Sequence, residues 1–197
     1  HKLLSEFLDE FPPLTPMPGK RHTDGNNWDA IISSLHINRS VKPVEWMKPG
    51  ENAAKIVLEN FLSEKLINYS SFRNDPVINA TSNLSAYIHF GHIAAQRIAL
   101  EIIKNYPRDI NTDAFLEELI VRRELSDNFC YYNNNYDSMN GIKPWAMQTL
   151  EQHRHDKREY KYTTDQFENA QTHDELWNAA QLEMIITGRM HGYMRMY

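Results

Sequence analysis

Apolar residues repeat at helical spacing along most of this chain, and strand-like alternation is scarce. In the segment that begins at Glu51, polar residues separate apolar ones every three or four positions: Ala54, Val57, Leu58, Phe61 and Leu62. This spacing places an apolar stripe on one face of a helix. A loop is expected over 68–81. The helical pattern then resumes at Ser82 and is expected to run to Tyr106, because Pro107 cannot continue a helix.

Two more helical segments follow. One runs from Thr112 to about Phe129, and a loop rich in tyrosine and asparagine comes after it at 131–140. The other begins at Thr172-His-Asp-Glu175, which matches a capping box, and ends at Gly188, a typical residue just past a helix C-terminus. Residues 189–197 are expected to start another helix.

Helix breakers concentrate in the first fifty residues. Prolines and glycines cluster at 12–25 and again at 43–50, and only a short amphipathic stretch at 29–35 lies between them. We therefore expect 1–50 to be an irregular wrapping segment and 51–197 to be one helical domain. The fold class predicted from these patterns is all-α.

Composition narrows the class of protein. Hydrophobic residues make up 41% of the 197 residues and charged residues 24%, so a packed core is expected and wholesale disorder is not. No apolar run approaches about 18 residues and no secretory signal is evident, which predicts a nuclear or cytoplasmic protein without membrane contact. The single cysteine, Cys130, excludes an internal disulfide. The net charge of -5 means that any contact with a polyanion must come from a focused surface.

A few clusters carry candidate chemistry. Thr81-Ser-Asn-Leu-Ser85 precedes a helical pattern, and its hydroxyls either cap the helix or form an anion site there. Glu118 and Arg122 are four positions apart, so they form either a surface ion pair or one wall of a cleft. His89 and His92 have metal-ligand spacing, but no carboxylate falls on the same turn, and no metal is expected.

Longer segments resemble a known family. TSNLSAYIHFGHIAAQR, FLEELIVRRELSDNFCYYNNNYDS, NRSVKPVEWMKPGENAA and the stretch from KREYKYTTDQ to the terminal MRMY closely resemble class II cyclobutane pyrimidine dimer photolyases. The resemblance runs nearly continuously from about Val41 to Tyr197. Class I photolyases and cryptochromes share only a looser skeleton of these motifs.

This resemblance implies an all-α FAD-binding catalytic domain of the photolyase/cryptochrome type. In that family the reduced, light-excited flavin passes an electron to a pyrimidine dimer that has been flipped out of UV-damaged DNA, and the dimer splits. The implied cofactor is therefore FAD and the implied partner is damaged DNA.

The resemblance also assigns site residues by position. Seven match residues that hold the cofactor or line its site: Tyr69, Arg73, Thr81, Ser82, Leu84, Ser85 and Arg195. Three match residues of the repair chemistry: Glu118 on the flipped lesion, Met196 beside it, and Trp177 in the tryptophan chain that photoreduces the flavin. A neutral or buried Glu118 is expected to stabilise the dimer radical anion.

The chain departs from the family pattern at both ends. Class II photolyases begin with a Rossmann-type α/β domain and continue past the point where the MRMYW motif stops here at Tyr197. We therefore expect an incomplete, doubly truncated FAD domain with an exposed apolar surface that favours self-association. Two other functions stay open: a photolyase-like light sensor without repair, and a helical module that has lost FAD.

Overall fold

The computed structural model describes residues 27–197, which form two units: residues 27–45 and Trp46–Tyr197. The predicted irregular segment 1–50 thus lies partly outside the described residues. In the first unit, α2 (Trp28–Ser34) matches the predicted amphipathic stretch, and the Asn27 side chain caps it at the Ala30 amide. Arg39 donates to carbonyls in the last turn of this helix. When only the described residues are considered, all side chains of α2 are exposed.

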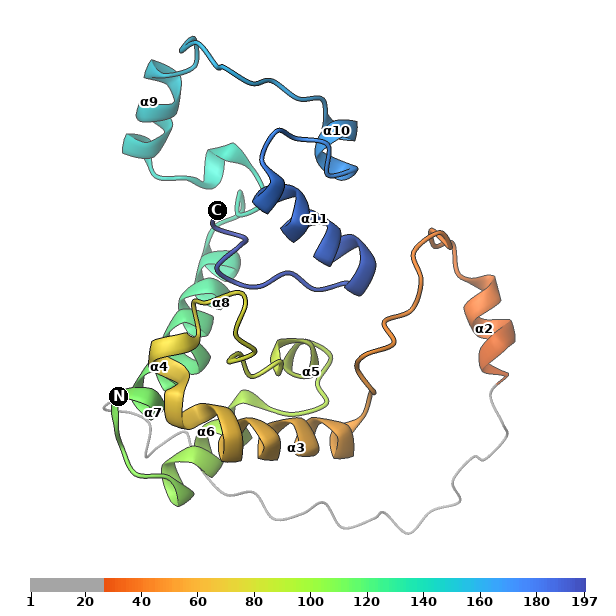
Figure 1. Ribbon diagram of the computed structural model, residues 1–197, viewed down its shortest axis with the longest axis vertical. Coiled ribbons are helices and arrows are strands. Elements are labelled where there is room, and N and C mark those ends of the chain that lie inside the picture. Colours follow the sequence, from red (N-terminus) through yellow and green to blue (C-terminus); the bar gives the residue numbers. More distant parts are fainter. Residues whose placement is uncertain (1–26) are drawn as a thin grey trace. The chain divides into compact units, whose positions relative to one another are not determined.

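The second unit is built from helices (Figure 1). Their bounds are α3 Glu51–Asn60, α4 Tyr69–Phe72, α5 Ser85–His89, α6 Ala95–Asn105, α7 Ile110–Leu116, α8 Arg123–Tyr132, α9 Pro144–Gln152, α10 Thr164–Glu168 and α11 Glu175–Thr187. No strand occurs among residues 27–197. The prediction of an all-α fold is confirmed.

An aromatic cluster forms the centre of this unit. Phe61, Tyr69 and Phe115 are each less than a tenth exposed. The ring centroids of Phe61 and Phe115 lie 4.6 Å apart, and the Tyr69 ring meets both edge-on at 5.7 and 5.3 Å. Fully buried Ile98 and Ile102 of α6 extend the core. Such ring geometry adds to the stabilisation that comes from buried area alone.

Two π-helical turns lie at the edges of this core. One, Phe61–Lys65, extends α3, and the other, Glu117–Arg122, joins α7 to α8. The backbone is therefore helical without a break from Ile110 to Tyr132. The predicted helical segment from Thr112 to Phe129 is confirmed, although its middle is wider than an α-helix. Wide turns of this kind are rare and occur often at functional sites.

The prediction of a single helix over 82–106 is wrong. The structure divides this stretch into α5 and α6, with a turn at Gly91, whose φ of +69° favours glycine. The His92 amide donates to the Tyr87 carbonyl at 2.8 Å, which closes the turn. The predicted end before Pro107 holds, because α6 stops at Asn105.

The start of α11 also differs from the prediction. Its N-cap is Asp174, whose carboxylate accepts from the Leu176 and Trp177 amides at 2.9 and 3.0 Å. The predicted capping box at Thr172 is wrong, because the Thr172 hydroxyl bonds to the Asn178 side chain instead. The other end is as predicted, with Gly188 in the left-handed conformation at φ +71°.

The predicted helix over 189–197 is wrong as well. This segment consists of turns, and the Tyr197 hydroxyl returns to the Asp174 carboxylate at 2.8 Å. His191 and Met194 are buried and fix the segment on the unit. These side-chain contacts replace the regular ladder that a helix would need.

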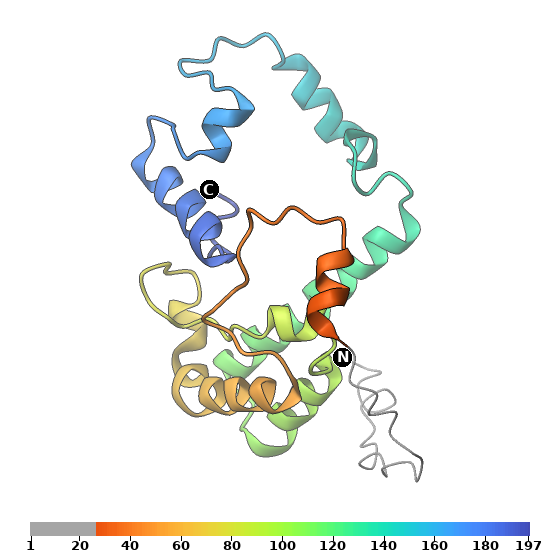
Figure 2. The ribbon, with the colours of Figure 1, turned by 90° about the vertical axis from the view of Figure 1, so that its right-hand side faces the viewer.

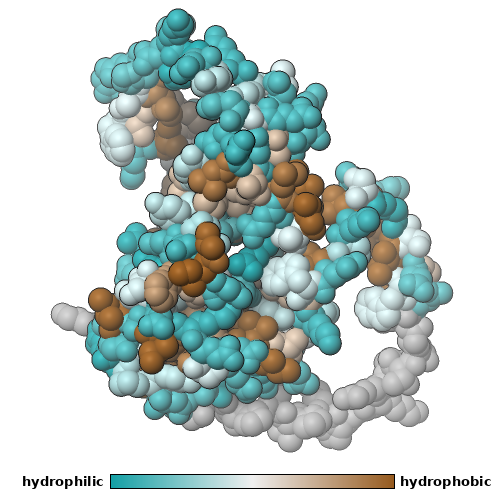
Figure 3. All heavy atoms as spheres, viewed as in Figure 1, coloured by the Kyte–Doolittle hydropathy of each residue, from teal (hydrophilic) through white to brown (hydrophobic). Residues whose placement is uncertain are grey.

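Outside the aromatic core, packing is sparse. Against the described residues, α8, α9 and α10 bury no side chain, and both views show α9 and α10 extending away from α3 to α7 (Figures 1 and 2). Helix α11 exposes Ile185 by 54% and Ile186 by 77%, and apolar surface is visible over this region (Figure 3). The expected apolar surface is therefore present, while self-association stays a prediction.

Removing the Phe115 ring from the aromatic core is expected to destabilise the protein strongly. We expect Phe115→Ala to lower the free energy of unfolding by about 3–5 kcal/mol, because it removes a buried ring and leaves a cavity. Ile110→Ala is the control, since Ile110 is 73% exposed on the same helix, and its change should stay within about 0.5 kcal/mol. Chemical denaturation of both variants measures the difference. Equal effects of the two substitutions would contradict this account of the core.

Asp174 predicts an acid-sensitive contact. Hydrogen bonds from the Trp177 amide and then from the Tyr197 hydroxyl lower the pKa of its carboxyl. A lowered folded-state pKa stabilises the protein above the ordinary aspartate pKa of about 3.9, and this gain disappears as the pH falls through the lowered value.

We therefore expect Asp174→Ala to melt at a lower temperature than the parent chain at pH 7, with the gap closing in acid. Asp174→Asn is the matched control, because asparagine caps as well as aspartate but does not titrate. Thermal melts between pH 2 and 7 (roughly spanning the aspartate range) measure both. A gap that does not change with pH would refute the assignment.

Candidate functional site

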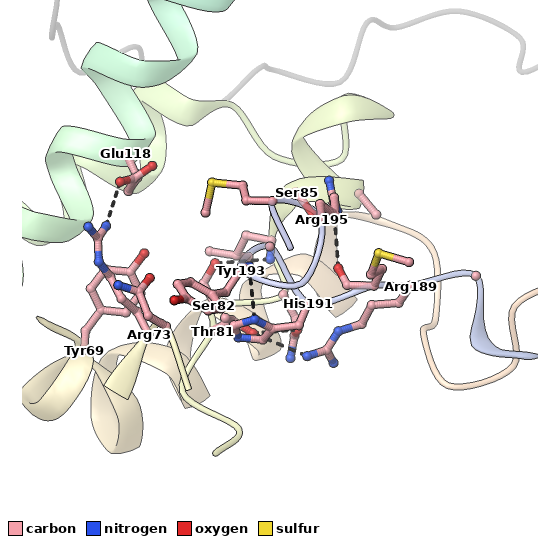
Figure 4. Close-up of a pocket in the computed structure, with 18 of the residues that line it drawn as sticks. Tyr69, Arg73, Thr81, Ser82, Ser85, Glu118, Arg189, His191, Tyr193 and Arg195 are labelled. Atoms are coloured by element: carbon pink, nitrogen blue, oxygen red, sulfur yellow. Dashed lines mark hydrogen bonds and ion pairs between the residues drawn. The ribbon is translucent and has the colours of Figure 1, made fainter. Parts of the chain in front are cut away.

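A cavity of about 780 Å³ opens in the second unit (Figure 4). Distant parts of the chain supply its walls: Trp46 and Met47, the end of α4, the loop 81–86, the second π turn and the segment 188–196. Nine of the ten residues predicted for the site line it: Tyr69, Arg73, Thr81, Ser82, Leu84, Ser85, Glu118, Arg195 and Met196. The fold thus brings together residues that lie up to about 127 positions apart (Tyr69 to Met196).

Glu118 and Arg73 form the polar corner of this cavity. The Arg73 guanidinium donates to Glu118 Oε1 at 2.7 Å, and Glu117 pairs with Arg122 at 3.4 Å. Of the two alternatives for Glu118, the ion pair with Arg122 is therefore wrong, and Glu118 lies on the wall of a cavity. The π turn explains the change, because its wider spacing aligns residues five apart and turns Glu118 toward α4.

The electrostatics of this corner keep Arg73 charged. Burial acts to lower the pKa of Arg73, but hydrogen bonds with Glu118 and Tyr69 outweigh it and raise the pKa. Burial raises the pKa of the Tyr69 hydroxyl. The Glu118 side chain is 43% exposed, so the expectation of a buried glutamate is wrong.

The Arg73–Glu118 pair contributes little to stability. Both side chains reach solvent, at 29% and 43% exposure, and exposed ion pairs are worth about 0–1 kcal/mol. A pair that stabilises the fold so weakly is better explained by what it presents to the cavity.

The hydroxyl-rich loop before α5 forms another wall. Asn83 adopts a left-handed conformation with φ +59°, and the Leu84 amide donates to the Ser82 hydroxyl at 3.4 Å. In the described part of the chain no side chain caps α5 at its N-cap, Leu84. The capping alternative is thus wrong at this position, and the Ser82 and Ser85 side chains line the cavity.

The segment 188–196 closes the cavity from the C-terminal side. Arg195 donates to the Met190 carbonyl at 3.2 Å, and the Tyr193 amide donates to His191 Nδ1 at 3.2 Å. His191 is 5% exposed, and its Nε2 has no hydrogen-bond partner among residues 27–197. Met196 is 77% exposed and presents an apolar side chain at the rim.

Sequence reasoning missed the contributions of Trp46, Arg189 and His191. Trp46 Nε1 donates to the Thr187 carbonyl at 2.8 Å, and the Arg189 guanidinium lies over its ring at 5.7 Å. Trp46 lies between prolines, so the sequence placed it in the irregular segment 1–50. Arg189 and His191 fall in 189–197, where a helix was expected. The glycines at 188 and 192 were the available signal for a loop there.

Trp177 lies outside the cavity lining. It is half-buried near the start of α11, and its ring meets Phe167 edge-on at 5.2 Å. The structure therefore separates this one predicted site residue from the other nine.

Neither a metal-binding cluster nor a membrane-spanning helix is present in residues 27–197. These residues contain no group of three or more histidine, cysteine, aspartate or glutamate side chains arranged to hold a metal ion. None of their helices combines the length and the apolar character needed to cross a membrane.

Known proteins are similar in sequence to this chain over its full length. No protein-family model matches the chain. Over its full length the chain is 49% identical to a deoxyribodipyrimidine photo-lyase of Oryza sativa subsp. japonica and 44% identical to one of Potorous tridactylus. It spans 40% and 38% of these relatives' lengths.

A solved structure shares the fold. A class III photolyase from Agrobacterium tumefaciens superposes with a TM-score of 0.60 at 22% identity, over 76% of this chain and 30% of that one. At this identity the likeness bears on the fold alone, and the fold is that of the photolyase helical domain. The chain is thus homologous, over its whole length, to a segment of proteins named deoxyribodipyrimidine photo-lyase.

Proposed function

We propose that this chain is the helical FAD-binding segment of a class II-like deoxyribodipyrimidine photo-lyase, which repairs cyclobutane pyrimidine dimers in UV-damaged DNA. One observation carries the proposal: nine of the ten residues assigned by the resemblance line one cavity. The names of the full-length matches favour repair over a light sensor or a module without flavin. A DNA substrate fits the expected nuclear or cytoplasmic location.

The residues around the cavity fit a flavin dinucleotide. A volume of about 780 Å³ lies within the range of roughly 300–1,000 Å³ that small-molecule sites occupy. Hydroxyls of Thr81, Ser82 and Ser85 offer hydrogen bonds to a diphosphate, and the buried Nε2 of His191 lacks a partner among the described residues. These residues, with Tyr69, are those we expect to hold FAD.

When bound, reduced FAD would supply the light-driven electron that splits the dimer. The chain's own task is then to hold the lesion and exclude water. The Glu118 carboxylate, oriented by Arg73 at 2.7 Å, presents an acceptor to the N–H edge of an extruded thymine. Exposed Met196 at the rim presents an apolar surface to the flipped bases.

Two further residues have roles in this proposal. Arg195 lies on the cavity wall, where its positive charge favours electron density on a neighbouring ring. Trp177 lies outside the cavity, in edge contact with Phe167, and we assign it to electron supply for photoreduction and not to the lesion site.

The lesion role of Glu118 gives a direct test. We expect Glu118→Gln to fold normally and to lower the quantum yield of repair several-fold, because the amide is a weaker acceptor than the charged carboxylate. The assay measures light-dependent loss of dimers from an irradiated oligonucleotide with the reduced, FAD-loaded chain.

Glu117→Gln is the matched control, because Glu117 neighbours Glu118 but does not itself line the cavity, although its partner Arg122 does. An equal yield in both variants would remove the role of Glu118. No dimer loss from the parent chain with reduced FAD bound would defeat the repair proposal.

The loop hydroxyls give a second test. We expect Ser82→Ala with Ser85→Ala to weaken FAD binding by about tenfold or more, because two hydrogen bonds of about 1 kcal/mol each are lost. Quenching of flavin fluorescence measures the affinity. Ser126→Ala is the control, since Ser126 lies on α8 outside the cavity lining and its hydroxyl donates to the Arg122 carbonyl. Unchanged FAD stoichiometry and affinity in the double variant would contradict the diphosphate assignment.

A further inference from the structure

The segment 188–196 is attached at its start to a residue that is far away in the sequence. Trp46 Nε1–H donates to the carbonyl of Thr187, the last residue of α11, at 2.8 Å. The guanidinium of Arg189 lies over the Trp46 ring, 5.7 Å from its centroid. One indole therefore contacts the chain both just before and just after it leaves the helix.

The chain next to Trp46 is attached to the opposite wall of the cavity. The Lys48 carbonyl accepts a hydrogen bond from the Tyr87 hydroxyl at 2.8 Å. Tyr87 is 2% exposed on α5, which follows directly after the hydroxyl-rich loop, so close packing holds it in place. Residues 46–48, which we call the strap, therefore connect the wall formed by that loop with the wall formed by 188–196.

Polar contacts, and not close packing, hold the strap. Trp46 is 46% exposed against the described residues. Trp46 and Met47 border the main cavity and also a smaller cavity of about 200 Å³. Because little packing opposes movement of the strap, its position depends on the hydrogen bonds at its two ends.

The segment 188–196 needs such an attachment. It contains no regular helix, and its buried side chains are those of His191 and Met194. Its far end is followed by the hydrogen bond from Tyr197 to Asp174. Segments with few buried contacts open at a lower free energy than cores do. Release at the start of the segment should therefore free it without unfolding the aromatic core.

We propose that Trp46 is a positioning residue, which holds the segment 188–196 at a fixed distance from the hydroxyl-rich loop and so sets the width of the cavity. It acts through the Thr187 carbonyl and the Arg189 guanidinium. The inference rests on the proposed function, because this segment carries the residues that the proposal assigns to the flavin and to the lesion.

Hydrogen exchange of the full chain, with no ligand added, tests the strap itself. We expect the amides of 188–196 to exchange about fivefold faster in Trp46→Phe, which loses the Nε1–H donor but keeps an aromatic ring beside Arg189. Trp46→Ala loses both contacts, and exchange should be about tenfold or more faster than in the parent chain. The amides of α6 report on opening of the core and should keep the parent rate in both variants.

Tyr87→Phe tests the other end of the strap, because it removes the hydroxyl and keeps the buried ring. We expect it also to speed exchange in 188–196, and an unchanged rate would overturn the connection between the two walls. Trp145→Phe and Trp145→Ala are the matched controls, since Trp145 is 72% exposed on α9 and lies outside the cavity lining. Parent rates in both Trp46 variants, or an equal acceleration in α6, would refute the positioning role.

FAD titrations test whether the strap serves the proposed site. A ligand that contacts both walls must itself hold the segment once the strap is released. We therefore expect FAD to bind several-fold more weakly to Trp46→Ala than to the parent chain, because fewer molecules have the segment in place. Saturating FAD should return exchange of 188–196 in this variant close to the parent rate. Trp145→Ala should bind FAD as the parent chain does.

The two measurements separate this inference from the proposed function. Faster exchange in the Trp46 variants, with weaker FAD binding and protection restored by FAD, supports both. Faster exchange without any FAD binding by the parent chain supports the strap and defeats the flavin proposal. FAD bound equally by the parent chain and by Trp46→Ala defeats the positioning role and leaves the proposed function standing.

Discussion

The packing of Phe61, Tyr69 and Phe115 is the constraint on which the site depends. Each ring belongs to a different helical element, and each is followed closely by a cavity residue or by the turn that orients one. Arg73 lies one turn after Tyr69, where its amide donates to the Tyr69 carbonyl at 2.9 Å, and Glu118 lies three positions after Phe115. Locking the rings therefore fixes the distance between the guanidinium and the carboxylate before any ligand is present.

The second π turn determines the direction in which the Glu118 carboxylate points. In a regular α-helix Glu118 would share a face with Arg122 and be neutralised along its own helix. The inserted π turn instead pairs Arg122 with Glu117 and leaves Glu118 to meet Arg73 from α4. A helix with one extra residue per turn is less favourable than a regular one, and here that irregularity coincides with the cavity.

Helical periodicity predicted the elements that bury an apolar stripe and failed where polar contacts decide the backbone. The segments with apolar stripes that begin at Glu51 and Thr112 are helical, because this spacing lets a helix bury its apolar face. The segments at Gly91, Thr172 and 189–197 were mispredicted because glycine conformations and side-chain bonds to distant residues determine them. The same limit applies to the site. Resemblance assigned residues along the chain, but only the structure shows that Lys65 and Arg189 lie close to Thr81.

The two sides of the cavity differ in stability, and this difference bears on ligand binding. One side rests on the aromatic core, whereas the segment 188–196 is tied down by Trp46 to Thr187 at one end and by Tyr197 to Asp174 at the other. Two of its side chains, His191 and Met194, are buried, and the neighbouring helices α8 to α10 bury none against the described residues. Regions with few buried contacts open at lower free energy than cores do, and a ligand that bridges both walls stabilises the weaker one by mass action. Under the proposed function, a dinucleotide that contacts the loop 81–86 on one wall and the segment 188–196 on the other would therefore order the segment that carries Arg195 and Met196. Binding of the proposed cofactor and assembly of the proposed lesion site would then be a single coupled event.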